Sequence, residues 1–326
     1  MDKTQLAETR TQCANIVSGI SDVFAGNKRW IVKILAAGLS GGHILFEDDP
    51  GSGRMQIAKV FARVCGLSFC RVHFTSDLSP ADFLGSCELP AENSESGFMN
   101  NPFSTNILLA NDINRAPPKT QTFLLEAIQE RRAVTEGKTL VLPEPFIVIA
   151  TQSLLERESL YPLTTAQLDC FSLKLSPGYA ESLAEESEIL AYLLAQQSNN
   201  PEKGISPVIS ADQFRKLQAL VENEVYVDKS IMDYVSRIVR GTREHPQVEK
   251  GLSPAGAVAQ LRVSRALALI SGRDYVTPDD IKSLVTEVMA HRLVLKREDS
   301  RQNTKPEEIL AEVVNAISIP VDSGPG

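Results

Sequence analysis

The chain has 326 residues, of which 43% are hydrophobic and 23% charged, with a formal net charge of −8 at pH 7. These values indicate a globular protein large enough for two domains, and the acidic balance argues against a nucleic-acid partner. No apolar run approaches the roughly 20 residues of a membrane span, and no leader pattern opens the chain, so we expect a cytoplasmic protein without a membrane span. The five cysteines lack paired or metal-ligand spacing, so we expect free thiols and no metal cluster.

The first half of the chain alternates between helical and strand patterns. Helical periodicity covers about residues 6–24, 30–39 and 57–64, and short apolar runs at 43–47, 106–110 and 146–150 predict buried strands. Continuous apolar strands separated by helices predict a parallel sheet covered on both faces. Residues 117–132 are expected to form a helix with proline in its first turn. Val134–Leu142 is expected to form a β-hairpin that turns at Gly137.

After about Pro177 the strand signals end and helical patterns dominate. Helices are predicted at about 180–197, 210–222, 228–243, 253–270 and 278–293, with a polar linker at 199–207. Thr277–Asp280 has the pattern of a helix start, and Thr304 with Glu307 has that of a capping box for a last helix. The expected domains are an α/β core at 1–177, a connecting helix and linker at 178–208, a helical domain at 209–320 and a disordered tail at 321–326.

A glycine-rich turn between a predicted strand and helix is typical of a phosphate site, because backbone N–H groups and the helix N-terminus attract anions. The stretch that has Walker A spacing, G-x-x-x-x-G-K-[ST], is Asp48-Asp49-Pro50-Gly51-Ser52-Gly53-Arg54-Met55. Asp48 stands at the first glycine position and would repel a polyphosphate. Arg54 stands at the lysine position and cannot simply replace an ammonium. Met55 stands at the Ser/Thr position and offers a poor ligand to Mg²⁺.

The rest of the chain resembles the MoxR-type AAA+ ATPases. Asn106–Gln121 closely resembles the Walker B segment of that family, which typically runs L-L-A-D-E-I-N-R-A-P-P-K-T-Q. Further stretches similar to the family are 124–131, 150–152, 161–169, 251–254 and 272–281, so the resemblance covers about residues 20 to 295. The resemblance implies a P-loop NTPase-like, doubly wound αβα parallel-sheet core with a smaller all-helical lid.

The resemblance also implies which positions would carry catalysis, and this chain departs from the family at five of them. The Walker B aspartate position holds Asn111 and the adjacent glutamate position holds Asp112, which is one methylene shorter. The sensor-1 asparagine position holds Ser153, the arginine-finger position holds Cys170 and the sensor-2 arginine position holds Ala255. Phosphoryl transfer depends on positioning and charge stabilisation, and an arginine finger alone is worth roughly 10³–10⁵ in rate. No catalytic set is therefore expected to be intact.

Three functional hypotheses follow. In the first, the chain is a catalytically inactive pseudo-ATPase that acts as a scaffold or regulatory subunit of a chaperone-like remodelling assembly. In the second, Arg54 and Asp112 still support weak ATP hydrolysis. In the third, the chain binds ATP or ADP as a switch without hydrolysis, with weakened Mg²⁺ coordination.

The resemblance further implies a homo- or hetero-hexameric ring, which could include an active MoxR paralogue, and a partner with a von Willebrand factor A domain. Arg115, Arg131 and Arg132 are candidates for a ring interface, and a solvated basic face is the equal alternative.

Overall fold

The computed structural model describes most of the chain. The described residues are 1–23, 28–47, 54–87, 101–135, 138–153, 161–176, 205–296 and 304–319, with single residues between 182 and 194. The predicted glycine-rich turn, most of the predicted helix 180–197, most of the linker and the tail at 321–326 lie outside the described residues.

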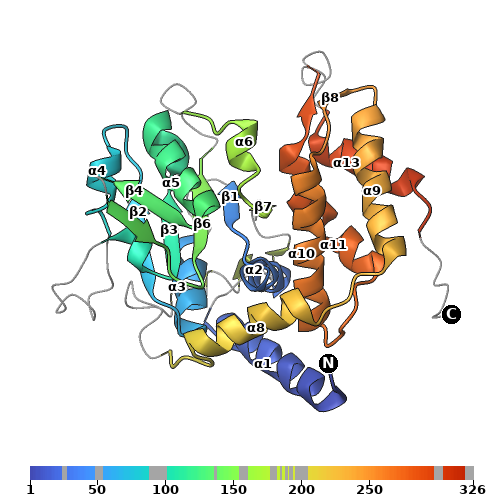
Figure 1. Cartoon of the computed structure of the whole chain (residues 1–326), viewed down its shortest axis with the longest axis horizontal. Coiled ribbons are helices and arrows are strands. Elements are labelled where there is room, and N and C mark those ends of the chain that lie inside the picture. Colours follow the sequence, from blue (N-terminus) through green and yellow to red (C-terminus); the bar gives the residue numbers. More distant parts are fainter. Residues whose placement is uncertain are drawn as a thin grey trace.

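A five-stranded parallel sheet lies at the centre of the first half of the chain (Figure 1), with strand order β2-β3-β6-β1-β7. Its strands are β1 (Ile44–Glu47), β2 (Phe69–His73), β3 (Ile107–Asn111), β6 (Ile147–Gln152) and β7 (Leu173–Leu175). The three strands predicted from apolar runs are thereby confirmed. The edge strand β2, which alternates between buried and half-buried residues, and the three-residue β7 were not predicted.

The side chains of the sheet divide between two hydrophobic clusters because successive residues of a strand point to opposite faces. In β3, Ile107 and Leu109 join a cluster with helices α1 (Lys3–Ser21), α2 (Lys28–Leu39) and α3 (Arg54–Val64). Leu108 and Ala110 join the opposite cluster, with α4 (Pro80–Phe83) and α5 (Pro118–Glu130). Both faces of the sheet are therefore covered, which explains why β1, β3 and β6 are apolar up to their carboxyl ends.

The remaining elements of the first half are short. The strands β4 (Arg132–Thr135) and β5 (Lys138–Val141) pair antiparallel, which confirms the predicted hairpin, and η2 (Pro102–Ser104) and η3 (Ile113–Arg115) are 3₁₀ turns before and after β3. Cys70 and Cys87 form a disulfide, with their Cα atoms 5.5 Å apart, so the expectation of five free thiols is wrong for these two.

The second half is mainly helical and lies beside the α/β part (Figure 1), as predicted. Its helices are α8 (Ala211–Asn223), α9 (Lys229–Glu244), α10 (Pro254–Ile270), α11 (Pro278–Met289), η5 (Ala290–Arg292) and α13 (Pro306–Ala316). Two strands interrupt the helices, β8 (Val248–Lys250) and β9 (Val294–Leu295), and they pair antiparallel. The expectation that no strand follows Pro177 is therefore wrong.

The predicted helix start at Thr277 is confirmed, because its hydroxyl accepts from the Asp280 backbone N–H and the Asp280 carboxylate accepts from the Thr277 N–H. The predicted box between Thr304 and Glu307 is wrong by one residue. The backbone N–H of Lys305 donates to Glu308 instead, 3.2 Å away, because α13 begins at Pro306.

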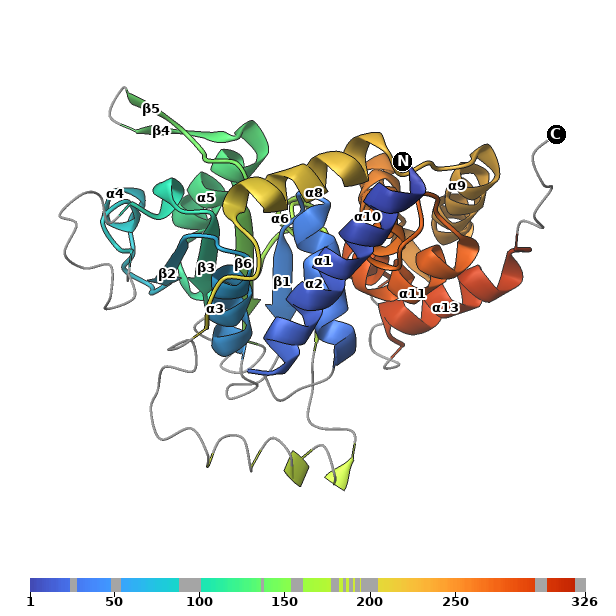
Figure 2. The same ribbon diagram turned by 90° about the horizontal axis from the view of Figure 1, so that it is seen from below.

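Helix α1 joins the two halves of the molecule. It packs against α2 and α3 on the sheet and against α10 of the helical part (Figure 2). Cys13, Ile16 and Ile20 on its buried face belong to the hydrophobic cluster that also contains residues of α10, so the core runs without a break from the sheet into the helical part. Within the described residues, no helix is both long enough and apolar enough to cross a bilayer.

Candidate functional site

The predicted glycine-rich turn lies between β1, which ends at Glu47, and α3, which begins at Arg54. The predicted site residues Asp48, Pro50, Gly51, Ser52 and Gly53 lie outside the described residues. Arg54 and Met55 form the first turn of α3, and their side chains also lie outside the described part. Strand β1 is therefore followed by helix α3, in the predicted order, and the turn between them lies outside the described residues.

The carboxyl ends of the parallel strands bring three other predicted residues, Asn111, Asp112 and Ser153, to the same edge. Ligands of open α/β sheets bind in the crevice outside these strand ends. Asn111 ends β3, Gln152 ends β6 and Glu47 ends β1. Asp112 and Ser153 follow Asn111 and Gln152 directly, so the Walker B and sensor-1 positions lie on neighbouring strands.

The side chain of Asn111 is held in a hydrogen-bond network with its neighbours. Its Nδ2 lies 2.9 Å from Nδ1 of His73 and donates to the carboxylate of Asp112 at 3.3 Å. Its Oδ1 accepts from the hydroxyl of Thr151 at 3.1 Å. The amide group therefore uses its donors and its acceptor within the protein. It presents no negative charge to a cation, and a neutral amide is a weaker magnesium partner than a carboxylate.

Asp112 adopts a left-handed backbone conformation, with φ 56° and ψ 49°. Its backbone N–H donates to the Thr151 hydroxyl at 2.8 Å, and its carboxylate lies 3.8 Å from Nε of Arg115. Non-glycine residues in this region are uncommon, and asparagine and aspartate tolerate it best. The base position therefore keeps a carboxylate, which the turn after β3 holds between Asn111 and Arg115.

A second polar group at this edge was not predicted. The carboxylate of Glu47 forms a 2.6 Å ion pair with Nζ of Lys174 on β7, and it accepts from Nε2 of Gln152 at 2.6 Å. All three side chains are half-buried. The ion pair lies directly before the glycine-rich turn. The signal that could have found Glu47 is its place at a strand end, which it shares with Asn111 and Gln152.

Ser153 at the sensor-1 position is buried, with 6% of its surface exposed. Its backbone carbonyl accepts from Nδ2 of Asn114 at 2.9 Å, which ties the end of β6 to the turn after β3. The structure therefore brings Asn111, Asp112 and Ser153 together, as the resemblance implies.

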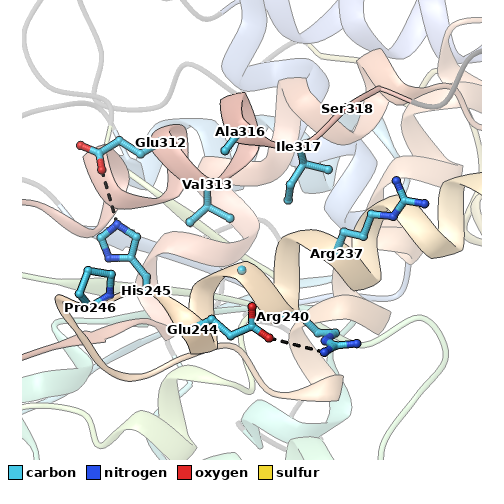
Figure 3. Close-up of a pocket in the computed structure, with 11 residues that line it drawn as sticks. Arg237, Arg240, Glu244, His245, Pro246, Glu312, Val313, Ala316, Ile317 and Ser318 are labelled. Carbon is cyan, nitrogen blue, oxygen red and sulfur yellow. Dashed lines mark ion pairs between the residues drawn. The ribbon is translucent and has the colours of Figure 1, made fainter.

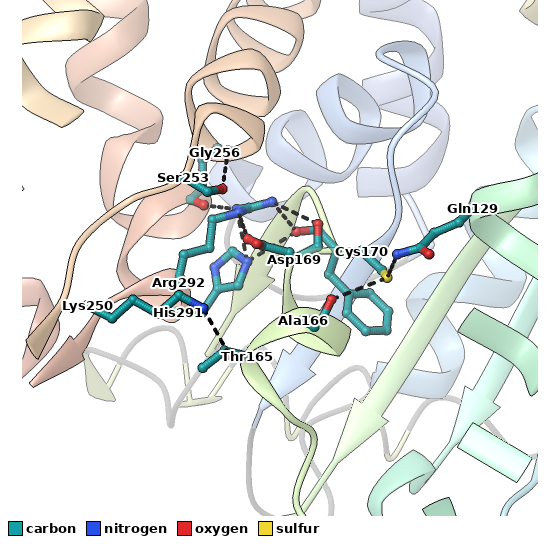
Figure 4. Close-up of polar contacts among 12 residues, drawn as sticks. Gln129, Thr165, Ala166, Asp169, Cys170, Lys250, Ser253, Gly256, His291 and Arg292 are labelled. Atoms are coloured by element: carbon teal, nitrogen blue, oxygen red, sulfur yellow. Dashed lines mark hydrogen bonds and ion pairs between the residues drawn. The ribbon is translucent and has the colours of Figure 1, made fainter. Parts of the chain in front are cut away.

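Cys170 at the arginine-finger position follows the short helix α6 (Thr165–Leu168), which Thr164 and Gln167 cap. Its thiol accepts from Nε2 of Gln129 at 3.0 Å and lies 3.7 Å from the carbonyl oxygen of Ala166 (Figure 4). Burial raises the pKa of Cys170, and the hydrogen bond from Gln129 partly offsets the rise. The finger position thus presents a neutral thiol that points back onto its own chain.

Ala255 at the sensor-2 position is exposed in the first turn of α10, after the cap residue Ser253. An alanine there has no charge with which to contact a phosphate. Ala255 lies in the helical part, and no side-chain contact among the described residues joins it to the network of Asn111.

The helical part is instead held to the core by Arg292, which sequence reasoning missed. Figure 4 shows Arg292 and His291 directed at the segment after α6. The guanidinium of Arg292 donates to Oδ1 of Asp169 at 3.0 Å, to the Phe171 carbonyl at 2.8 Å and to the Val288 carbonyl. Burial lowers the pKa of Arg292, while Asp169 raises it. We call these contacts the Arg292 clamp.

His291 supports the clamp from the same turn. Its Nε2 lies 3.1 Å from the Phe171 carbonyl oxygen and 3.0 Å from Nη1 of Arg292. Burial lowers the pKa of His291 well below its usual value, and the positive charge of Arg292 lowers it further. The histidine is therefore a neutral hydrogen-bonding group at neutral pH. Across the described residues, no group of three or more His, Cys, Asp or Glu side chains has the arrangement of a metal site.

Comparison with known proteins agrees with this architecture. Residues 43–173 match the family described as ATPase family associated with various cellular activities (AAA), and residues 240–313 match the AAA lid domain. A crystal structure from Cytophaga hutchinsonii, described as a candidate ATPase, superimposes with a TM-score of 0.86 at 27% identity and covers 98% of each chain.

Two curated relatives align along most of the chain. The uncharacterised protein YeaC of Bacillus subtilis is 40% identical over 94% of each chain. Chaperone MoxR1 of Mycobacterium tuberculosis is 35% identical over 92% of this chain and 80% of its own length. With the parallel sheet and the helical lid in place, these matches show that the chain belongs to the MoxR-type AAA+ ATPase family.

Proposed function

We propose that this chain is a catalytically inactive MoxR-like protein that serves as a scaffold or regulatory subunit of a chaperone-like remodelling assembly. The observation that carries the proposal is the network of Asn111. The position that would help to hold Mg²⁺ is occupied by the neutral amide of Asn111. This amide is hydrogen-bonded to Asp112 and Thr151, so these polar groups are already engaged with one another. Replacing these contacts with a hydrated cation would require the network to be broken.

The positions that respond to nucleotide in the family pattern support the same proposal. Cys170 and Ala255 bring no positive charge to a developing phosphate charge, although such charges are a main source of catalysis in phosphoryl transfer. Meanwhile the Arg292 clamp holds the lid to the core through residues of this chain alone. A lid that is held in place without contacting a phosphate is what we expect of a subunit that acts as a scaffold and does not hydrolyse ATP.

The AAA+ family is typically oligomeric, and a MoxR chaperone is among the relatives. We propose that the chain acts in a homo- or hetero-hexameric ring, with an active paralogue supplying the missing catalytic groups, and that a von Willebrand factor A domain protein is a partner. Native mass spectrometry of the purified chain, alone and with an intact MoxR protein, tests the ring. A chain that stays monomeric under both conditions would contradict it.

A second candidate, nucleotide binding with little or no hydrolysis, is favoured by one specific observation. Strand β1 ends at Glu47 and helix α3 begins at Arg54, with the glycine-rich stretch between them in the sequence, and a strand–turn–helix unit binds phosphate through backbone N–H groups that do not depend on the side chains of Arg54 or Met55. ATP or ADP would then stabilise the fold without being consumed. Asp112 would be the base in a weakly active version, because it keeps a carboxylate at the end of β3.

The two candidates separate in a calorimetric titration with ATP and Mg²⁺, combined with a phosphate-release assay on the same sample. The inactive scaffold predicts no phosphate release, and release by the wild type that Arg54→Ala abolishes would disprove it. Heat of binding without release would support the nucleotide-held form. The absence of both would leave the scaffold as the function and remove nucleotide as a cofactor.

A further inference from the structure

We propose that a cavity between the core and the lid, separate from the nucleotide position, binds a compact small-molecule polyanion. The cavity has a volume of about 530 Å³, which is within the usual range for small-molecule sites. Four arginines line it: Arg131 after α5, Arg215 on α8, and Arg262 and Arg265 on α10. We call it the arginine cavity.

The charges of the arginine cavity are unbalanced. Two carboxylates also line it, those of Glu144 and Glu222, so four positive charges face two negative ones. The chain as a whole carries a net charge of −8, which makes a local surplus of positive charge at one cavity a departure from the rest of the molecule. A cavity lined by one sign of charge concentrates ions of the opposite sign.

Three of these arginines have no carboxylate partner within the described part of the chain. The ion pairs described within 4.0 Å include neither Arg131 nor Arg215 nor Arg262. The guanidinium groups therefore keep their planar sets of donors available. Such donors match the oxygens of phosphate and carboxylate groups in pairs.

Arg265 is the preorganised member of the set. It is half-buried, and its guanidinium donates to the backbone carbonyls of Val225 and Glu222, which fixes its direction. Burial lowers the pKa of Arg265, Glu222 partly offsets this effect, and the positive charge of Arg262 lowers it further. Repulsion between Arg262 and Arg265 is a cost to the empty cavity that a bound anion would relieve.

A pocket of the lid provides a contrast. It has a volume of about 740 Å³ and lies between α9 and α13 (Figure 3). There two pairs form, Arg240 with Glu244 at 3.5 Å and His245 with Glu312 at 3.5 Å, and Arg237 is the other arginine of the lining. Two arginines face two glutamates in this pocket, so its arginines bring no surplus of positive charge, unlike those of the arginine cavity.

The arginine cavity lies at the opposite end of the sheet from the glycine-rich turn. Its wall includes Ser40 and Gly41 before β1, and Phe146 before β6, whereas the glycine-rich turn follows the carboxyl end of β1. Figure 2 shows α8 crossing the end of the sheet where β1 begins, and Gln218 of α8 donates to the Gly38 carbonyl there. The four residues of β1 span about 13 Å, so one ligand does not occupy both places.

The ligand chemistry is two or more closely spaced oxyanions, supplied by either a diphosphate or a di- or tricarboxylate. Because the arginines come from both halves of the molecule, such a ligand would join the core to the lid. The bound form would therefore be more stable than the free form by mass action.

The test is isothermal titration of the full chain with inorganic pyrophosphate and, separately, with citrate. We expect one of the two to bind, which identifies the source of the oxyanions, and Arg215→Ala/Arg262→Ala to weaken that binding by about tenfold or more. Both side chains are exposed, so the double variant should fold. If it does not, Arg262→Gln alone should weaken binding in the same direction.

Two controls place the ligand. Arg240→Ala changes the lid pocket and should leave binding unchanged. Arg54→Ala changes the glycine-rich turn and should also leave it unchanged. Loss of binding in Arg54→Ala, with full binding by the double variant, would place the anion at the nucleotide position and overturn the proposal. Absence of heat from both ligands at millimolar concentration would overturn it as well.

Discussion

The Arg292 clamp can be tested by Arg292→Met, which keeps most of the apolar stem and removes every donor of the guanidinium. The Arg292 side chain is 2% exposed and that of Asp169 is 31% exposed. Breaking a fully buried ion pair costs about 3–5 kcal/mol. The exposure of Asp169 reduces this cost, whereas the loss of a charged donor to the Phe171 and Val288 carbonyls adds to it. We expect the free energy of unfolding to fall by about 3 kcal/mol.

Urea unfolding followed by circular dichroism measures this loss. The matched control is Arg240→Met, because the Arg240 side chain is 75% exposed and pairs with Glu244 within one helix. That change should alter the free energy of unfolding by no more than about 0.5 kcal/mol. A loss of less than about 1 kcal/mol in Arg292→Met would refute the inference that the clamp holds the lid to the core.

Three further predictions concern stability. Burial, with a smaller effect of Arg131, lowers the pKa of His43 from 6.5 to about 3. The stability that neutral His43 contributes is therefore complete above pH 6.5 and is lost as the pH falls toward 3. Between pH 6.5 and 5 this loss lowers the free energy of unfolding of the wild type by about 2 kcal/mol, and the His43→Asn variant should not show that part of the decrease. The same pH dependence of urea unfolding in both proteins would contradict this. Gly66→Ala should cost about 2 kcal/mol or more, because Gly66 has φ +62° and a Cβ there would lie 2.4 Å from a backbone oxygen. Gly85→Ala should change stability little, because the nearest atom to its Cβ would be a backbone oxygen at 3.8 Å, an ordinary contact; equal losses would disprove the argument. Asn111→Asp should cost about 1 kcal/mol at pH 7 by placing a second carboxylate beside Asp112, and millimolar Mg²⁺ should reduce that cost; no response to Mg²⁺ would show that the edge of the sheet cannot hold the ion.

The sequence predicted the parts of the fold whose signals are local. The buried strands β1, β3 and β6 are continuously apolar up to their carboxyl ends, and the start at Thr277 combines a cap, a proline and two acids. The edge strand β2 carries Arg71 and His73 among its apolar residues, and β7 has three residues, so neither stands out from a loop. The hairpin of β8 and β9 joins strands of three and two residues.

The candidate site divides in the same way. Asn111, Asp112 and Ser153 follow predicted strands, so family motifs could place them at one edge of the sheet. The pairs formed by Glu47 with Lys174 and by Asp169 with Arg292 join residues that are 127 and 123 positions apart. Nothing in a single sequence indicates which distant residues will meet, because the folded backbone determines those pairs. The glycine-rich turn lies outside the described residues, so its predicted chemistry stays a prediction.

The position of α1 has a consequence for cooperativity. Because one face of this helix contributes Cys13, Ile16 and Ile20 to a cluster shared by the sheet and α10, neither half of the molecule can lose its structure without exposing apolar surface of the other. Heating should then melt the two halves in one calorimetric transition, although the chain contains two recognisable folding units. The lid would behave as part of a single thermodynamic body.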